Sequence, residues 1–391
     1  GKILAELGAD VIKLEPPGGD PIRSTGPFYH NEPHPEKSLL WFALNRSKRG
    51  ITLNLETTDG RDIFLRLVKS ADFVIETFAP GRLDSLGLGY KALSDLNPRL
   101  ILTSITPFGQ SGPHKDYKAS DIVSMAMGGL MSLCGEEPRP PVRFSVPQAM
   151  FHAGAQAAAG TMVAHYFREI TGEGQHVDVS IQECLTLACY NSQQFWNMHR
   201  VVRKRYSTGW DQGPPMGFSE REFPCKDGYI AGSIAGPSAP TLLKWLAEVE
   251  FDEGISESLK KRDWSKLDSR NITPEERRQL ENAVKRFAMS HTADELYDGA
   301  LQRRVFWFKV NTPDGIVESP QLSARDYFVS LEHPELEDTI TYPGAPIKLS
   351  ETPWQIRCRA PLIGEHNLAV LHEELGISEQ DLAILKAHGV I

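Results

Sequence analysis

The sequence predicts an α/β protein with a doubly wound, mostly parallel sheet in a large domain and a smaller α+β domain. Strand-like and helix-like segments alternate through the first half of the chain, and glycine- and proline-rich loops follow the strands. The composition becomes charged and helical beyond about residue 205. We therefore expect a Rossmann-like large domain at 1–205 and 311–391, with a small domain and its linkers at 206–310.

Length and composition are those of an ordinary globular protein. The chain has 391 residues, more than one hydrophobic core usually supports, with 40% apolar and 24% charged residues. Lys and Arg number 42 against 51 Asp and Glu, a net charge of −9, which does not favour nucleic acid as a partner. No apolar run reaches the roughly 20 residues that span a bilayer, so no membrane partner is expected.

The five cysteines lack the paired spacing of a zinc site or a disulfide framework. They are scattered along the chain and odd in number: Cys134, Cys184, Cys189, Cys225 and Cys358. This distribution is typical of reduced thiols in a cytoplasmic protein. We expect no metal site.

The expected elements follow one another in a strand–helix order. Strands are expected at 11–15, 50–55, 72–77, 100–106 and 175–181. Helices are expected at 1–8, 60–71, 82–98 and 151–170. The helix over 151–170 is rich in alanine and glycine, which permits close packing in a core or at a subunit interface, and Gly172 ends it.

Three loops should lie at the carboxyl edge of the sheet, where open parallel sheets bind their ligands. They are "EPPGGDP" at 15–21, "TFAPGR" at 77–82 and "PFGQSGP" at 107–113. None has the GxGxxG or GxxxxGK[ST] pattern of a phosphate-binding loop. This absence is evidence against a nicotinamide dehydrogenase or a nucleotidase.

Several motifs in a fixed order give the whole chain, residues 1–391, a specific resemblance. They are "LAELGADVIKLEPPGGDPIR", "RSKRGITLNL", "PGRLDSLGLGY", "NPRLILTSITPFGQSGP", "TGEGQHVDVSIQE", "SPQLSARDYF", "YPGAPIKLSETP" and "PLIGEHN". In this order and spacing they resemble the class III CoA-transferases, the group of formyl-CoA transferase, carnitine CoA-transferase and α-methylacyl-CoA racemase. The resemblance also implies about twenty further residues before Gly1, as the abrupt start of the helical pattern suggests.

The resemblance implies an activity and an assembly. Family members move CoA between carboxylic acids through an aspartate that attacks the acyl-CoA thioester, and they bind CoA thioesters as substrates without a permanent cofactor. Their ring-shaped chains form an interlocked dimer, with active sites between the large domain of one chain and the small domain of the other.

The aspartate of the family falls at Met150, within "VPQAMFHAG" at 146–154. A thioether has no ionisable oxygen, so it cannot form an acyl anhydride or transfer a proton. His152 is a poor substitute, because residues two apart on a helix point about 200° from each other. We therefore expect no catalytic residue at this position.

Several positions implied to contact CoA have also changed. Where relatives carry cations or an amide, this chain has Glu56, Thr77, Ala79 and Ser85. Each lost charge-assisted phosphate contact costs about 1.5–3 kcal/mol, so the CoA site is expected to be weakened. Three residues are expected remnants of the CoA site: Phe78, Gly81 and Lys118. Lys118 could alternatively be an ordinary surface lysine.

For the other candidate site residues, a purely structural role is at least as well supported as a functional one. Ser120 replaces the histidine of the racemase branch, and Asp121 is expected to cap the helix that begins at Ile122. Arg23 and Arg46 are candidates for anion contacts, with solvated charge as the default. A loop resembling the active-site lid could equally be a linker; its candidate residues are Trp210, Gln212, Gly213 and Gly217.

These expectations favour a non-catalytic subunit of a heteromeric CoA-transferase, completed by a homologous subunit that carries the aspartate. The resemblance offers succinyl-CoA and benzylsuccinate, from anaerobic aromatic degradation, as one donor and acceptor pair. In such a complex CoA could bind only in the partner's site. Two alternatives stay open: a homo-oligomeric acyl-CoA isomerase or lyase whose acid–base group has moved to His152 or Asp121, and a regulatory pseudoenzyme.

Overall fold

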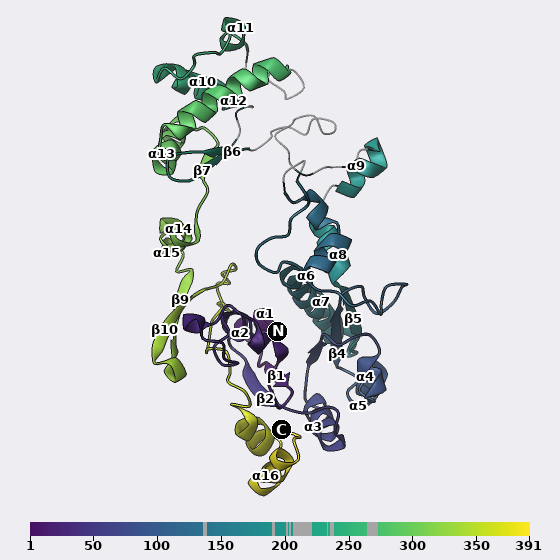
Figure 1. The fold of residues 1–391 in the computed structure, drawn as a ribbon. Helices are drawn as coiled ribbons and strands as arrows, with labels where there is room; N and C mark the ends of the chain where they lie inside the picture. Colours follow the sequence, from purple (N-terminus) through teal and green to yellow (C-terminus); the bar gives the residue numbers. More distant parts are fainter. Residues whose placement is uncertain are drawn as a thin grey trace. The chain divides into compact units, whose positions relative to one another are not determined.

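The computed structural model describes residues 1–135, 139–189, 192–200, 202, 205, 221–232, 234, 238–263 and 273–391. The chain divides into two compact units (Figure 1). The first comprises Gly1–Gln193 and Gln321–Ile391, and the second comprises Gln194–Pro320. The second unit is thus an insertion in the sequence of the first, and the range predicted for the small domain, 206–310, lies within it.

The first unit contains parallel strands in two groups. β1 (Ile12–Glu15) pairs with β2 (Arg49–Thr52), while β3 (Phe73–Glu76), β4 (Ile101–Thr106) and β5 (His176–Ser180) form a sheet in that order. All three pairings are parallel, which confirms a mixed α/β fold with parallel strands. The central strand β4 is buried along nearly its whole length, and all its residues except Ser104 are apolar or β-branched.

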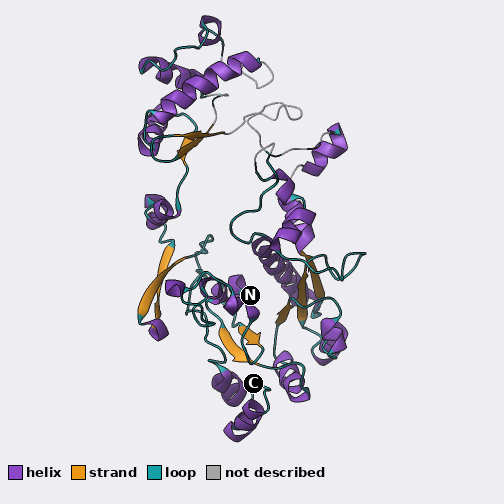
Figure 2. Ribbon diagram, in the orientation of Figure 1, coloured by secondary structure: helices purple, strands orange, loops and turns teal. Residues whose placement is uncertain are grey.

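Helices pack against both faces of the three-stranded sheet (Figure 2). On one face the Thr103 hydroxyl lies 2.7 Å from the Thr161 hydroxyl of α7 (Ala149–Thr171), and on the other Leu102 packs with Leu93 of α5 (Tyr90–Leu96). The helices of the first unit are α1 (Lys2–Glu6), α2 (Leu39–Asn45), α3 (Thr58–Val68), α4 (Arg82–Ser85), α5 (Tyr90–Leu96), α6 (Asp121–Met127), α7 (Ala149–Thr171), α8 (Ile181–Ala188) and α16 (Glu379–Ala387). Gly172, in the left-handed conformation, ends α7 as predicted. Within the described ranges, no helix is both long and apolar enough to cross a membrane.

The C-terminal part of the chain completes the first unit. The antiparallel strands β9 (Phe328–His333) and β10 (Asp338–Pro343) form a hairpin, and Tyr342 of this hairpin packs with Trp41 and Phe42 of α2. A π-helix at Leu368–Glu374 follows and packs against β2. Two short helices, α9 (Ser192–His199) and α15 (Pro320–Ala324), span the boundaries between the units.

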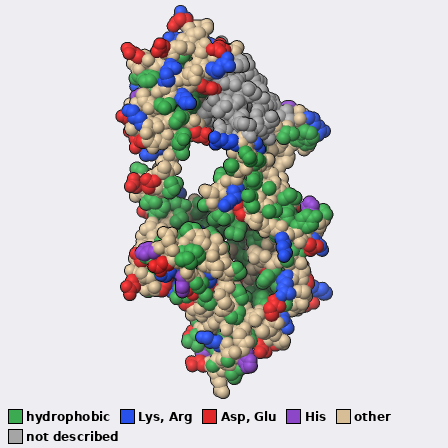
Figure 3. All heavy atoms as spheres, in the orientation of Figure 1, with side chains coloured by type: hydrophobic (Ala, Val, Ile, Leu, Met, Phe, Trp, Pro, Cys, Tyr) green, Lys and Arg blue, Asp and Glu red, His purple; other side chains and the backbone are tan. Residues whose placement is uncertain are grey.

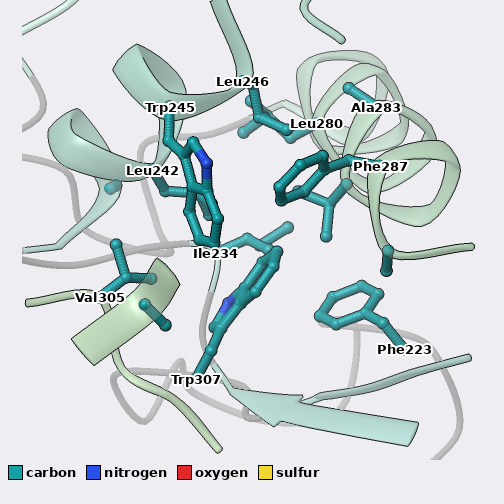
Figure 4. Close-up of a cluster of buried hydrophobic side chains, with 14 of the residues drawn as sticks. Phe223, Ile234, Leu242, Trp245, Leu246, Leu280, Ala283, Phe287, Val305 and Trp307 are labelled. Carbon is teal, nitrogen blue, oxygen red and sulfur yellow. The ribbon is translucent and has the colours of Figure 1, made fainter. Parts of the chain in front are cut away.

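The second unit is an antiparallel sheet packed with helices. Its strands β6 (Arg221–Pro224), β7 (Tyr229–Gly232) and β8 (Trp307–Lys309) pair in that order. Trp245, Phe287 and Trp307 point toward one another in its core, and the last two are fully buried (Figure 4). The helices are α10 (Ala239–Glu248), α11 (Glu257–Lys260), α12 (Pro274–Met289), α13 (Ala293–Arg303) and α14 (Pro313–Val317).

Candidate functional site

Met150 is the second residue of the long helix α7, and its side chain is 44% exposed. A helix N-terminus carries partial positive charge, which favours an anionic side chain such as a nucleophilic carboxylate. Methionine makes no use of that field. His152 lies on the same continuous helix, so the two side chains point about 200° apart.

The N-terminus of α7 is capped by a residue from another helix. Gln148 makes no side-chain cap, and the Ala149 N–H instead donates to Asp121 Oδ1, 2.8 Å away at the start of α6. The prediction that Asp121 caps its own helix is therefore wrong, because its carboxylate turns to a segment 28 residues further along the chain. Its other oxygen, Oδ2, is buried with no hydrogen-bond partner among the described residues.

The loop at 77–81 follows β3 at the carboxyl edge of the sheet. The Phe78 N–H donates to the Glu76 carboxylate at 2.6 Å, and the Phe78 ring is 44% exposed. Gly81 has φ +77° and precedes α4, a left-handed conformation that favours glycine. Both predicted remnants, Phe78 and Gly81, therefore lie on one short loop held to the end of β3.

An ion pair joins the residue that follows this loop to the segment between β2 and α3. Arg82, directly after Gly81, pairs with Glu56 and also donates to the Ser85 hydroxyl. Arg82 was not among the predicted site residues, because the resemblance places the expected cations at other positions. The Arg82 guanidinium is therefore paired with a carboxylate inside this chain.

Lys118 lies in the long loop before α6, and its side chain is exposed. None of the ion pairs found among the described residues involves it. The neighbouring Tyr117 ring stacks on His114, with 4.7 Å between ring centroids. The loop is thus ordered by aromatic contacts, and the Lys118 ammonium group projects from it.

A cavity of about 140 Å³ lies between the sheet and the α4–α5 segment, and Ala79 and Gly81 of the loop line it. Its polar wall is a chain of hydrogen bonds. Ser104, only 2% exposed, lies 2.9 Å from His176 Nε2 and also contacts the Glu76 carboxylate. Burial raises the pKa of the Glu76 carboxyl, which the hydrogen bonds from Ser104 and the Phe78 amide oppose.

This Glu–Ser–His set does not have the geometry of a hydrolase triad. In a triad the histidine bridges the acid and the nucleophile, whereas here Ser104 bridges Glu76 and His176. The arrangement holds the carboxylate that anchors Phe78, rather than activating a serine. None of the three residues was predicted from the sequence, although the parallel register sets His176 and Ser104 on neighbouring strands of one sheet.

Arg23 and Arg46, predicted as candidates for anion contacts or solvated charges, are neither. Each is 1% exposed. Arg23 pairs with Glu15 at 2.7 Å and lies 3.6 Å above the Trp41 ring. Arg46 pairs with Glu6 at 3.1 Å. Both guanidinium groups are therefore used inside the first unit, and the sequence pattern could not reveal their partners.

The predicted lid residues Trp210, Gln212, Gly213 and Gly217 lie outside the described residues. In the part of the chain that is described, no group of His, Cys, Asp and Glu side chains is arranged to hold a metal ion. All five cysteines are free thiols.

Comparison with known proteins tests the resemblance that the motifs predict. A sequence profile described as CoA-transferase family III matches residues 1–367. The chain belongs to CoA-transferase family III. The resemblance predicted from the motifs is thereby confirmed.

Relatives within CoA-transferase family III cover nearly the whole chain. It is 37% identical to the succinyl-CoA:(R)-benzylsuccinate CoA-transferase subunit BbsE of Thauera aromatica, over 95% of this chain and 89% of that protein. It is 32% identical to the formyl-CoA:oxalate CoA-transferase of Streptomyces avermitilis, over 100% of this chain and 94% of that protein. A CAIB/BAIF family protein from Brucella suis has a similar structure, with a TM-score of 0.80, 29% identity, and coverage of 95% and 94% of the two chains.

Proposed function

We propose that this chain is the nucleophile-lacking subunit of a heteromeric CoA-transferase that moves CoA between carboxylic acids. The observation that carries the proposal is Met150, at the helix start where the family places its aspartate. The similarity to the BbsE subunit supports succinyl-CoA as the donor and benzylsuccinate as the acceptor.

The chemistry explains why a second subunit is required. Transfer through an acyl anhydride and an aspartyl thioester needs a carboxylate oxygen that attacks the thioester carbonyl and later accepts CoA. The Met150 sulfur can do neither, and the Asp121 carboxylate nearby is already bound to the Ala149 N–H. The nucleophile therefore comes from a homologous subunit that retains the aspartate.

The contribution of this chain is structural and extends to the partner's site. The family arrangement of interlocked rings, with each active site built from two chains, would make the second unit of this chain part of the partner's site. The predicted lid residues Trp210, Gln212, Gly213 and Gly217 would then act there. This chain's own CoA site keeps three remnants, Phe78, Gly81 and Lys118. Its affinity for CoA is weakened because the Arg82 cation is paired with the Glu56 carboxylate.

Co-production with the aspartate-bearing homologue from the same genome tests the proposal. CoA transfer from succinyl-CoA to benzylsuccinate should be absent with either subunit alone and present with both. Changing the partner's nucleophilic aspartate to asparagine should abolish it. Transfer by this chain alone would refute the proposal, and isomerisation of an acyl-CoA by this chain alone would instead favour a relocated acid–base group.

A second variant separates loss of the nucleophile from loss of the CoA site. Met150→Asp should leave the isolated chain inactive, because one carboxylate does not restore the phosphate contacts. Met150→Asn is the matched control for changes in helix stability at this position. Substantial transfer by Met150→Asp alone would show that only the nucleophile had been lost.

A further inference from the structure

The helix α7 has two contrasting faces. One face packs on β4 and β5 and is made of small or buried residues: Ala149, Ala153, Ala157, Ala158, Thr161, Ala164 and Arg168. The opposite face, called here the outer face of α7, points away from the sheet. Its apolar residues are Phe151, Ala155, Ala159, Met162, Val163, Tyr166 and Ile170, which share one side of the helix by their spacing of three or four residues. His152 and Glu169 fall on the same side, near its two ends.

The outer face of α7 is apolar and open to solvent. Val163, Tyr166 and Ile170 are 70%, 71% and 68% exposed, while Phe151 and Met162 are 47% and 43% exposed. Residues 149–167 contain no Asp, Glu, Lys or Arg. Hydrophobic side chains also stand open in the space-filling view over the region of α6, α7 and α8 (Figure 3). Such a continuous apolar stripe marks a surface that another protein covers.

The size of this surface suits a protein partner. With roughly 150–200 Å² for each large side chain, the five together offer on the order of 500 Å² of apolar surface. A standard interface takes ~800 Å² from each partner, so the outer face alone supplies much of one. A small ligand would need a concave pocket, whereas this face is the convex side of a helix.

The shape of the outer face indicates the kind of partner. The small side chains of Ala155 and Ala159 leave a shallow depression between Phe151 at one end and Met162 to Ile170 at the other. A helix that crosses at the two alanines can approach closely while its own large side chains pack beside Phe151 and Val163. The absence of Asp, Glu, Lys and Arg between residues 149 and 167 disfavours a partner that is steered by ion pairs and favours a large, well-packed, obligate contact.

We propose that the outer face of α7 is the docking surface for the homologous, aspartate-bearing subunit, through an apolar helix of that subunit. This inference rests on the proposed function, which supplies the partner. A subunit of the same fold has a helix equivalent to α7, so two related helices meet across the interface as in a pseudo-symmetric dimer. The contact then joins the subunits along the same helix that carries Met150 in its first turn.

The test measures association separately from activity. Val163→Asp places a charge in the middle of the outer face, and Ile384→Asp on α16, where Ile384 is 49% exposed, is the matched control in the same unit. Both variants are co-produced with the aspartate-bearing homologue, and the complex is quantified by size-exclusion chromatography with light scattering. Val163→Asp should lower complex formation at least tenfold while its circular dichroism and melting stay near those of the control.

Hydroxyl-radical footprinting of the unmodified chain provides a second readout that does not depend on a variant. Met162 and Tyr166, both reactive with hydroxyl radicals, should be oxidised in the isolated chain and protected in the complex. Equal oxidation in both states, or a Val163→Asp complex as abundant as the control, would overturn the proposal. If Met162 and Tyr166 are already protected in a monomeric isolated chain, the outer face is covered by this chain's own residues. If the isolated chain forms a homodimer that Val163→Asp dissociates, the outer face binds a second copy of this chain. Either result would also overturn the proposal.

Failure of this inference is distinguishable from failure of the proposed function. A complex that forms through the outer face but transfers no CoA leaves the docking surface intact and refutes the function. An active complex that Val163→Asp does not weaken refutes the docking surface and leaves the function intact.

Discussion

Replacing Glu56 with lysine should strengthen CoA binding by the isolated chain. Glu56→Lys puts a cation where the resemblance implies one and releases Arg82 from its ion pair. The side chains of Arg82 and Glu56 are 41% and 62% exposed, so their pair contributes at most about 1 kcal/mol and its loss should not threaten the fold.

The magnitude depends on how many of the two cations, Lys at position 56 and the released Arg82, bind a phosphate of CoA. One charge-assisted hydrogen bond is worth about 1.5–3 kcal/mol, and the exposure of the loop favours the lower end. If one cation binds, the Kd for CoA should fall about tenfold, and if both bind, about a hundredfold. Glu56→Gln, which only releases Arg82, should give the smaller improvement.

Isothermal titration calorimetry with CoA and dephospho-CoA, at low and high salt, measures the effect. The improvement should shrink as salt screens it. Glu169→Lys is the charge-matched control, because Glu169 is similarly exposed at 54% and also pairs with an arginine, Arg99. The reasoning fails if Glu56→Lys leaves the Kd unchanged, or if Glu169→Lys improves it equally.

Two further changes test the roles of buried charges. Arg23→Met should lower the free energy of unfolding by about 3–5 kcal/mol without changing CoA affinity, because it leaves the fully buried Glu15 carboxylate unpaired. Urea unfolding followed by tryptophan fluorescence measures this loss. Arg23→Met with Glu15→Gln should recover much of it, and a loss below about 1 kcal/mol would contradict the structural role. Glu76→Gln should stabilise the chain at neutral pH and have no such effect in acid. Burial raises the pKa of Glu76 above its usual value, so the wild-type chain loses stability as the pH rises through the folded-state pKa. Unfolding at a series of pH values checks the sign, and a variant that is less stable at neutral pH but not in acid would contradict it.

Much of the fold was predictable because the signals are local. The strand at Ile101–Thr106 is, apart from Ser104, a short run of apolar and β-branched residues, a composition that favours a buried strand. The end of α7 at Gly172 follows from the left-handed conformation that glycine adopts readily. The position of Met150 at a helix start also follows from periodicity and motif spacing.

The charged residues were less predictable, because burial depends on partners far away in the chain. Arg23 and Arg46 look alike in sequence to solvated or ligand-binding arginines, yet both are buried against carboxylates. Asp121 has the sequence of a local helix cap and instead caps α7. Arg82 directly follows a loop whose sequence indicates lost cations, and its pairing partner Glu56 lies 26 residues earlier in the chain, just before α3.

The sequence by itself indicated that the chain has parallel α/β units and that its helix start carries a thioether where the resemblance places a nucleophile. Residue identity decides whether a side chain can attack a thioester, so no structure was needed for that conclusion. Only the tertiary structure decided which charges are neutralised and which apolar residues remain uncovered. Arg23 and the outer face of α7 show the two cases. Burial and pairing depend on contacts between residues distant in sequence, and these exist only once the chain has folded.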